Sequence, residues 1–194
     1  MGSPIDNGGR PASKLWVVVA QIILAAVGLA ACSLHTSAPP SATSTVVAQI
    51  IDGDTVVLRF PNGNEETVRL LGIDTPETVD PTRPVQCFGP EASAHLAGLI
   101  PQGTPVYLER DIEARDRFGR LLAYIYRSAD DLFVNAEMLR AGFADVSIFA
   151  PNNAHQSDLT EAATSARTRS VGLWATCGGP DVPLEPDEYV SAEG

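Results

Sequence analysis

The sequence predicts an α+β domain that consists of a small five-stranded β-barrel and three helices. Five short stretches rich in β-branched and apolar residues are separated by glycine, proline and asparagine turns, which is typical of strands. Three other stretches place apolar residues at helical spacing. The length of 194 residues allows one ordinary domain with accessory segments.

The strands are expected where apolar stretches lie between turn signals. Asp-Gly-Asp and Pro-Asn-Gly separate the first three, and a charged turn over 111–119 separates the last two. The predicted strands cover 46–51, 55–60, 65–73, 105–110 and 120–126.

The first helix is expected over 90–99, because Pro90 suits a first helical turn and the apolar residues that follow share one face. A second over 135–141 stops at Gly142, and a third over 153–171 carries a buried stripe. An OB-fold barrel satisfies this count of strands and helices, and such barrels often bind nucleic acids or sugars.

Residues 1–31 have the layout of a secretory signal. Arg10 and Lys14 precede an apolar run, which ends in small residues before Cys32. The sequence Leu-Ala-Ala-Cys resembles the lipobox of bacterial lipoproteins, and this resemblance implies that Cys32 is lipidated. An uncleaved transmembrane anchor is the alternative, since the run lies at the short end of a bilayer span. Both interpretations predict an exported, membrane-attached domain.

Composition divides the remainder of the chain. Residues 32–45 are rich in Ser, Thr, Ala and Pro, which predicts a flexible tether. A folded domain is expected over 46–178, and an acidic, disordered tail over 179–194.

The net charge of −11 argues against the basic surface that most nucleic-acid-binding domains carry. A bound divalent cation would offset several of the carboxylates locally. The only lysine, Lys14, precedes the predicted anchor, so every basic side chain of the folded part is an arginine. Phosphate contacts from basic residues would therefore use the planar guanidinium group.

Cys87 and Cys177 form an even pair once Cys32 is assigned to the anchor. In an oxidising compartment a disulfide is expected, and it would stabilise the fold by about 4 kcal/mol in the loop-entropy model. Two free thiols are the less favoured alternative. A metal site is less favoured still, because neither a CxxC motif nor clustered histidines accompany the two cysteines.

Three motifs carry candidate chemistry. Asp52 and Asp54 flank a glycine at the first turn, where carboxylates can hold a hard cation, although Asp-Gly is also an ordinary hairpin turn. The stretch 69–77 brings together an arginine, an aspartate and a glutamate, which are the groups that phosphodiester hydrolysis needs. The alternative is that these residues form a surface ion-pair network. In the turn 116–120, Arg120 could face a phosphate opposite Arg69, although alone this turn would be solvated.

Five motifs in order, IDGDT, RLLGIDTPET, FGPEAS, DRFGR with LAYIY, and APNNAH, resemble the staphylococcal nuclease family over about residues 46–175. The resemblance implies an OB-fold with three helices that cleaves DNA and RNA with one Ca²⁺ ion; we expect a monomer. The resemblance implies that Asp54, Asp74 and the carbonyl of Thr75 bind the metal ion. It implies that Glu77 activates the attacking water and that Arg69 and Arg120 bind the phosphate. Asp52 would act indirectly, without binding the ion.

The chain departs from the family pattern at the expected substrate contacts. Arg117 stands where the family has lysine, and Phe118 where tyrosine is usual; both are predicted to contact substrate. The family's tyrosine pair before Pro-Asn-Asn is absent, since this chain reads Val-Ser-Ile-Phe over 146–149. We predict an active enzyme with weaker substrate binding. The alternatives are a non-catalytic nucleic-acid- or protein-binding module and a structural envelope lipoprotein.

Overall fold

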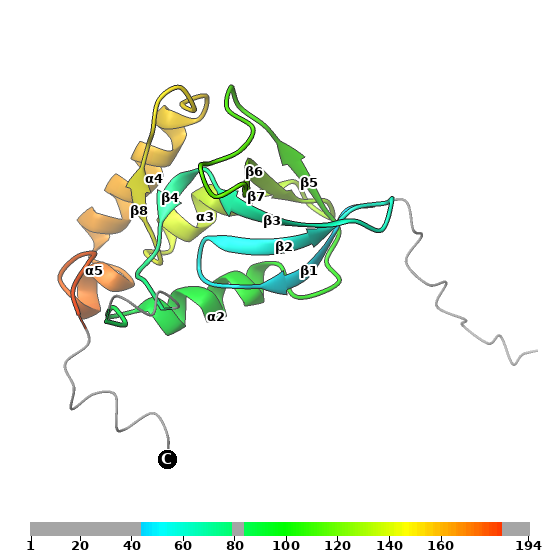
Figure 1. The fold of residues 1–194 in the computed structure, drawn as a ribbon. Helices are drawn as coiled ribbons and strands as arrows, with labels where there is room; N and C mark the ends of the chain where they lie inside the picture. Colours follow the sequence, from blue (N-terminus) through cyan, green and yellow to red (C-terminus); the bar gives the residue numbers. More distant parts are fainter. Residues whose placement is uncertain (1–43, 79–83, 184–194) are drawn as a thin grey trace, which may run out of the picture. The chain divides into compact units, whose positions relative to one another are not determined.

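The structure, a computed structural model, describes residues 44–78 and 84–183 (Figure 1). The predicted secretory signal, the lipidation site Cys32 and nearly all of the tether lie outside these residues, so these features stay predictions. No helix within the described ranges is long and apolar enough to cross a bilayer.

A mixed β-sheet forms the centre of the domain, with strand order β1-β2-β3-β6-β5 and the short β7 paired to β6 (Figure 1). β3 and β6 pair in parallel, and the other neighbours in this sheet are antiparallel. A separate two-stranded ladder joins β4 to β8. The strands are β1 Val46–Ile50, β2 Thr55–Arg59, β3 Glu65–Leu70, β4 Gly72–Asp74, β5 Val106–Glu109, β6 Leu121–Arg127, β7 Leu132–Phe133 and β8 Asp145–Ser147.

The two end strands of the sheet meet at one point. An isolated bridge joins Val46 to Pro105, and the N–H of Val106 donates to the carbonyl of Thr45 at 3.0 Å. No continuous ladder joins β1 to β5 among the residues described. The α+β class is therefore confirmed, whereas the closed OB-fold barrel stays a prediction.

The predicted strand over 65–73 is wrong in one respect, because it breaks into β3 and β4. Gly72 has a φ of 77°, a left-handed backbone conformation that interrupts a strand. The break turns β4 away from the central sheet to pair with β8. Sequence periodicity missed β7 and β8, since two or three residues are too few to show an alternating pattern.

The three predicted helices are confirmed, with shifted ends. α2 contacts β1, and α4 contacts β4 and β8 (Figure 1). α4 begins later than predicted because residues 153–155 lie in a turn, and a further short helix, α5, precedes Cys177. The helices are α2 Gly89–Leu99, α3 Val134–Arg140, α4 Gln156–Arg169 and α5 Leu173–Thr176.

A buried asparagine fixes the point where β3 ends. The side-chain amide of Asn135, on α3, donates to the carbonyl of Leu71 at 2.8 Å and accepts from the N–H of Ile125 at 2.9 Å. Both bonds satisfy backbone groups that would otherwise be buried without partners. Asn135 thus holds the strand break against β6. Arg69 lies before the break, on β3, and Asp74 lies after the break, on β4.

Contacts with the domain continue beyond residue 178, the predicted boundary. The N–H of Cys87 donates to the carbonyl of Val182 at 2.7 Å, and Gln86 forms an antiparallel bridge with Pro183. Residues of the segment 179–183 therefore contact the domain, whereas the bounds of the domain and of the acidic tail stay predictions. The amino-acid composition of this segment did not predict these contacts, because they are backbone contacts and do not depend on hydrophobic side chains.

Candidate active site

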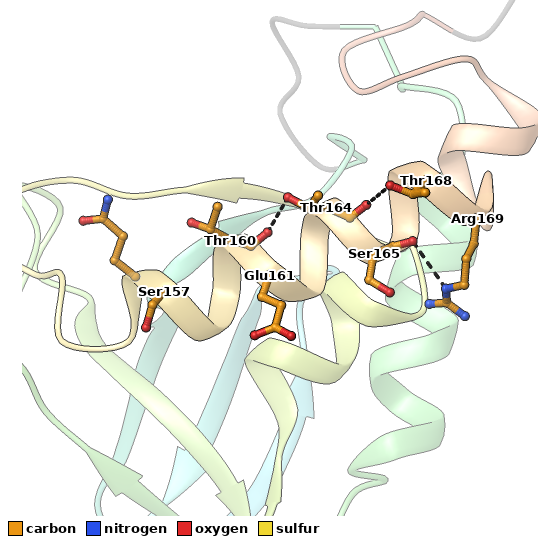
Figure 2. A pocket seen from close by; sticks show the side chains of 8 residues that line it. Ser157, Thr160, Glu161, Thr164, Ser165, Thr168 and Arg169 are labelled. Carbon is orange, nitrogen blue, oxygen red and sulfur yellow. Dashed lines mark hydrogen bonds between the residues drawn. The ribbon is translucent and has the colours of Figure 1, made fainter.

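Two hollows differ in their chemistry. The larger, about 850 Å³, follows the exposed outer face of α4 (Figure 2). Its side chains come from a single helix, and two of its threonine hydroxyls, Thr164 and Thr168, donate to backbone carbonyls of that same helix. The smaller, about 470 Å³, gathers charged groups from several elements. Convergent ionisable groups mark a functional site better than volume does, so the smaller cavity is the candidate.

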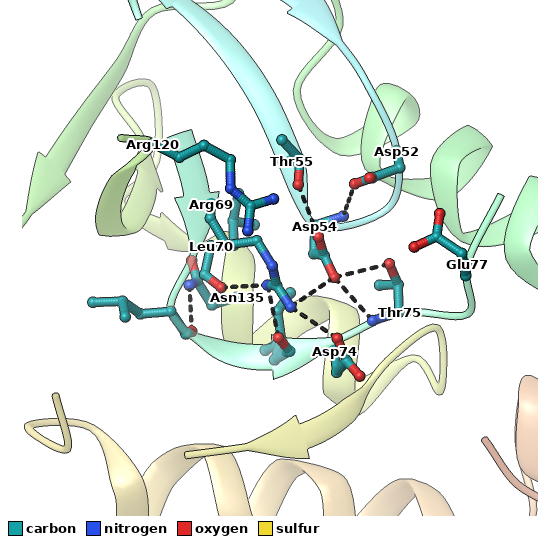
Figure 3. A network of polar contacts seen from close by, with 12 residues as sticks. Asp52, Asp54, Thr55, Arg69, Leu70, Asp74, Thr75, Glu77, Arg120 and Asn135 are labelled. Carbon is teal, nitrogen blue, oxygen red and sulfur yellow. Dashed lines mark hydrogen bonds and ion pairs between the residues drawn. The ribbon is translucent and has the colours of Figure 1, made fainter. Parts of the chain in front are cut away.

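The smaller cavity brings together most residues that the motifs predict. They come from the turn after β1, from β3 and β4, from the segment after β4, and from the turn before β6 (Figure 3). The predicted residues that line it are Asp52, Asp54, Arg69, Asp74, Thr75, Glu77, Arg117 and Arg120. Phe118 instead lines an adjoining hollow that shares Arg69, Arg117 and Arg120 with this cavity.

Asp54 is the most buried carboxylate of the site, with 6% of the residue exposed. Its Oδ2 accepts from the N–H and the hydroxyl of Thr75 at 3.0 and 3.1 Å, and its Oδ1 accepts from the hydroxyl of Thr55 at 3.0 Å. A buried carboxylate is stable only when such donors and an opposite charge compensate for lost hydration.

Arg69 supplies the opposite charge and joins the two aspartates. Its Nη2 lies 3.0 Å from Asp54 Oδ2 and 2.8 Å from Asp74 Oδ1 (Figure 3). Its Nη1 donates to the carbonyls of Leu70 and Ile73, both at 2.8 Å, on either side of the strand break. The break therefore positions the guanidinium and brings two carboxylates that are distant in the chain to one nitrogen.

The donor set fits a hard divalent cation held by few protein ligands. Asp54 and Asp74 offer carboxylate oxygens that already converge on one positive group, and Thr75 offers a backbone carbonyl nearby. In the described residues, no group of three or more His, Cys, Asp or Glu side chains is arranged to hold a metal ion.

Asp52 shapes the first turn rather than facing Arg69. Its Oδ1 accepts from the N–H of Asp54 at 3.0 Å, which holds the turn that presents the Asp54 carboxylate. Burial raises the pKa of Asp52 to about 6, and the negative charge of Asp54 adds to this rise. The two neighbouring carboxylates repel each other, and a cation beside them would relieve that repulsion.

Glu77 lies in the segment after β4, outside regular secondary structure. The residue is half-buried, and its carboxylate faces the same cavity as Asp54 and accepts from the N–H of Thr78 at 2.9 Å (Figure 3). The backbone of Glu77 is held by Gln86, whose side-chain oxygen accepts from its N–H at 2.6 Å. This places a carboxylate at the cavity edge on a fixed backbone.

Arg120 is held by Asp116, from the turn before β6. Its Nε donates to Asp116 Oδ2 at 2.7 Å, while Asp116 Oδ1 accepts from the backbone N–H groups of Phe118 and Arg120, both at 2.9 Å. Burial opposes ionisation of Asp116, but the hydrogen bonds from Arg120 outweigh it and lower the pKa. Arg117 instead places its guanidinium over the exposed Phe118 ring, 4.7 Å from the centroid.

Sequence reasoning missed three residues that line the cavity, Gln86, Phe149 and Asp181. Gln86 and Asp181 are joined by a hydrogen bond of 2.9 Å from Gln86 Nε2 to Asp181 Oδ1. The predicted disulfide could have indicated that these two residues lie close together, because Gln86 is next to Cys87 and Asp181 is close in sequence to Cys177. Phe149 carried no helical or strand pattern, and 76% of it is exposed beside the cavity.

The structure joins Cys87 to Cys177 by a disulfide across a sequence separation of 90 residues. Cys87 lies two residues before α2, and Cys177 directly follows α5. The bond therefore attaches the C-terminal residues to the segment that leads into α2, close to Gln86 and the cavity.

The family model for the staphylococcal nuclease homologue matches residues 67–176. The chain is 36% identical over 131 residues to the thermonuclease of Staphylococcus intermedius, an alignment that covers 68% of this chain and 76% of that protein. It is 37% identical over 130 residues to the SPbeta prophage-derived endonuclease YokF of Bacillus subtilis, covering 66% of this chain and 43% of that protein. It is also 33% identical over 146 residues to the endonuclease YncB of Bacillus subtilis, covering 74% and 67%. The chain thus belongs to the staphylococcal nuclease homologue family.

Proposed function

We propose that this protein is a Ca²⁺-dependent nuclease that hydrolyses phosphodiester bonds of DNA or RNA. One observation carries the proposal: Asp54, Asp74, Glu77, Arg69 and Arg120, which come from separate segments, line one cavity. The names of the thermonuclease and endonuclease relatives support an enzyme of the nuclease class. A base, two phosphate-binding arginines and cation-binding groups in one place are what hydrolysis requires, and they favour an enzyme over a binding module.

Asp54, Asp74 and the carbonyl of Thr75 are the groups that would hold the ion. When bound, Ca²⁺ supplies electrostatic stabilisation to a phosphoryl oxygen. Calcium suits these ligands because it takes carboxylate, carbonyl and water oxygens in flexible geometry. The negative charge of Asp52, which also lines the cavity, adds to the local attraction for a cation.

The side chains of the protein supply the remaining steps. The Glu77 carboxylate would accept a proton from the attacking water, because it lies at the cavity edge on a backbone fixed by Gln86. Arg69 and Arg120 would donate hydrogen bonds to the phosphate oxygens, where negative charge increases in the transition state. Asp116 keeps the Arg120 guanidinium oriented for this contact.

Removal of divalent ions tests the proposal. Purified protein should degrade single-stranded DNA, duplex DNA or RNA in Ca²⁺, and EDTA should lower the rate by about 100-fold or more, since metal chemistry contributes several kcal/mol. Added Ca²⁺ should restore the rate. Thermal unfolding in EDTA serves as the control that the protein stays folded. Cleavage that persists in EDTA, or binding of all three substrates without hydrolysis, would contradict the proposal.

Phe149 is the candidate ring for base stacking in place of the absent tyrosine pair. It is 76% exposed, beside the cavity and beside the hollow that Phe118 lines. Phe149→Ala is expected to raise KM by about 5- to 150-fold, because stacking contributes about 1–3 kcal/mol per base, with little change in kcat. Ile112→Ala, which shortens another exposed apolar side chain away from the cavity, is the control. A selective fall in kcat would argue against a stacking role.

A further inference from the structure

Gln86 contacts the backbone of Glu77 from both sides. Its side-chain Oε1 accepts from the N–H of Glu77 at 2.6 Å, and its own N–H donates to the carbonyl of Glu77 at 2.8 Å. Gln86 is 6% exposed, so these bonds are formed away from water and are hard to exchange. The residue therefore fixes both polar backbone groups of Glu77.

The other end of the Gln86 amide is fixed by the C-terminal segment, which we define as residues 177–183. Nε2 donates to Asp181 Oδ1 at 2.9 Å. An amide can bond in two orientations, with its oxygen and nitrogen exchanged, whereas an ionised carboxylate only accepts. Asp181 therefore selects the orientation in which Oε1 faces the N–H of Glu77. The opposite orientation would place two donors against each other.

The disulfide keeps this segment in place. Cys87, next to Gln86, is bonded to Cys177, and the N–H of Cys87 donates to the carbonyl of Val182 at 2.7 Å. Gln86 also forms a bridge with Pro183. The segment is thus attached on both sides of Asp181, by a covalent bond before it and by backbone contacts after it.

This support matters because Glu77 has no regular secondary structure of its own. A general base loses efficiency steeply when it is misplaced, and a shift of about 1 Å can lower the rate by about 100-fold. Backbone hydrogen bonds from a neighbouring helix or strand usually provide such precision. Here Gln86 provides backbone hydrogen bonds of this kind to Glu77.

We propose that Gln86 is a positioning residue for Glu77, and that Asp181, placed by the Cys87–Cys177 disulfide, fixes the orientation of the Gln86 amide. The inference rests on the proposed function, because it assumes that Glu77 acts on the attacking water. It adds a part of the site that the motifs do not contain: a C-terminal segment that acts on the base through one buried amide.

An exchange of partners tests the proposal in the full-length protein. In Gln86→Glu the new carboxylate can still accept from the N–H of Glu77, but it cannot donate to Asp181 and repels it. We expect kcat to fall by about 10- to 100-fold with KM changed by less than about threefold. In the double variant Gln86→Glu/Asp181→Asn, the amide introduced at position 181 can donate to the carboxylate introduced at position 86, and kcat should rise again by about tenfold. Gln156→Glu, which adds the same charge on the exposed face of α4, is the matched control.

The outcomes separate positioning from simple stability. Rescue of kcat by the double variant, with similar melting temperatures for all variants, supports the proposal. An equal kcat for the single and double variants overturns the coupling to Asp181. An unchanged kcat in Gln86→Glu overturns the proposal that the bond from position 86 to Asp181 positions Glu77. If the unmodified protein cleaves in Ca²⁺ and Glu77→Gln is impaired while Gln86→Glu is not, only this inference fails and the proposed function stands.

The disulfide arm is tested by Cys87→Ser/Cys177→Ser. The kcat of this variant should be lower than that of the unmodified protein. When the same two cysteine changes are added to Gln86→Glu, kcat should fall by less than about a further twofold, because both changes act on the same amide. The assay is run well below the melting temperature of the least stable variant. Full additivity of the two losses would overturn the assignment of the disulfide to this positioning role.

Discussion

Glu77→Gln is expected to lower kcat by about 10²- to 10⁴-fold, the range for the loss of a general base. The substitution keeps the shape of the side chain, and the amide oxygen can still accept from the N–H of Thr78 as the carboxylate does at 2.9 Å. The backbone bonds to Gln86 are unaffected, since they involve no atom of the Glu77 side chain. The loss should therefore lie in the chemical step, without a loss of structure.

Single-turnover cleavage of a defined oligonucleotide in Ca²⁺ measures this step directly. Glu161→Gln makes the same change on the exposed face of α4 and should leave the rate unaltered (Figure 2). Substrate affinity, measured by titration of a labelled oligonucleotide, should change by less than about threefold. Glutamine removes the negative charge that repels the substrate phosphate and also removes one hydrogen-bond acceptor, and these two effects oppose each other. Robust cleavage by Glu77→Gln would exclude Glu77 as the base.

Sequence patterns predicted those strands and helices that are specified by their own consecutive residues. Alternation and turn signals located β1, β2, β3, β5 and β6 of the central sheet, and helical spacing located α2, α3 and α4. The break at Gly72 was missed, because its left-handed conformation allows β4 to pair with β8, a partner far along the chain. Strands as short as β7 and β8 are formed through such pairing and carry little pattern of their own.

The candidate site divides in the same way. The motif residues Asp54, Arg69 and Asp74 were found because their chemical types recur in short, spaced motifs, and the structure brings them into contact. Gln86 and Asp181 were missed because a neutral amide and one acid of an acidic tail are unremarkable by type. Their importance comes from long-range contacts that the disulfide imposes, which a single sequence shows only as two cysteines.

Arg120→Ala is expected to lower kcat by about 10³-fold, or about 4 kcal/mol of transition-state stabilisation, because an arginine that faces developing phosphate charge contributes in this range. The turn should survive, since Asp116 Oδ1 still accepts from the backbone N–H groups of residues 118 and 120. The Asp116 side chain is 16% exposed and keeps its two backbone hydrogen bonds, so the loss of the ion pair should cost less stability than the loss of a fully buried pair.

Arg120→Lys separates charge from shape. It keeps the positive charge but loses the planar, forked donor, so kcat should lie between the values of the alanine variant and the unmodified protein. Arg59→Ala removes an exposed arginine that pairs with Glu65 across β2 and β3, away from the cavity, and should leave kcat unchanged. Because the expected loss lies in the transition state, kcat and kcat/KM should fall together. A rise in KM alone would instead assign Arg120 to ground-state binding of the substrate.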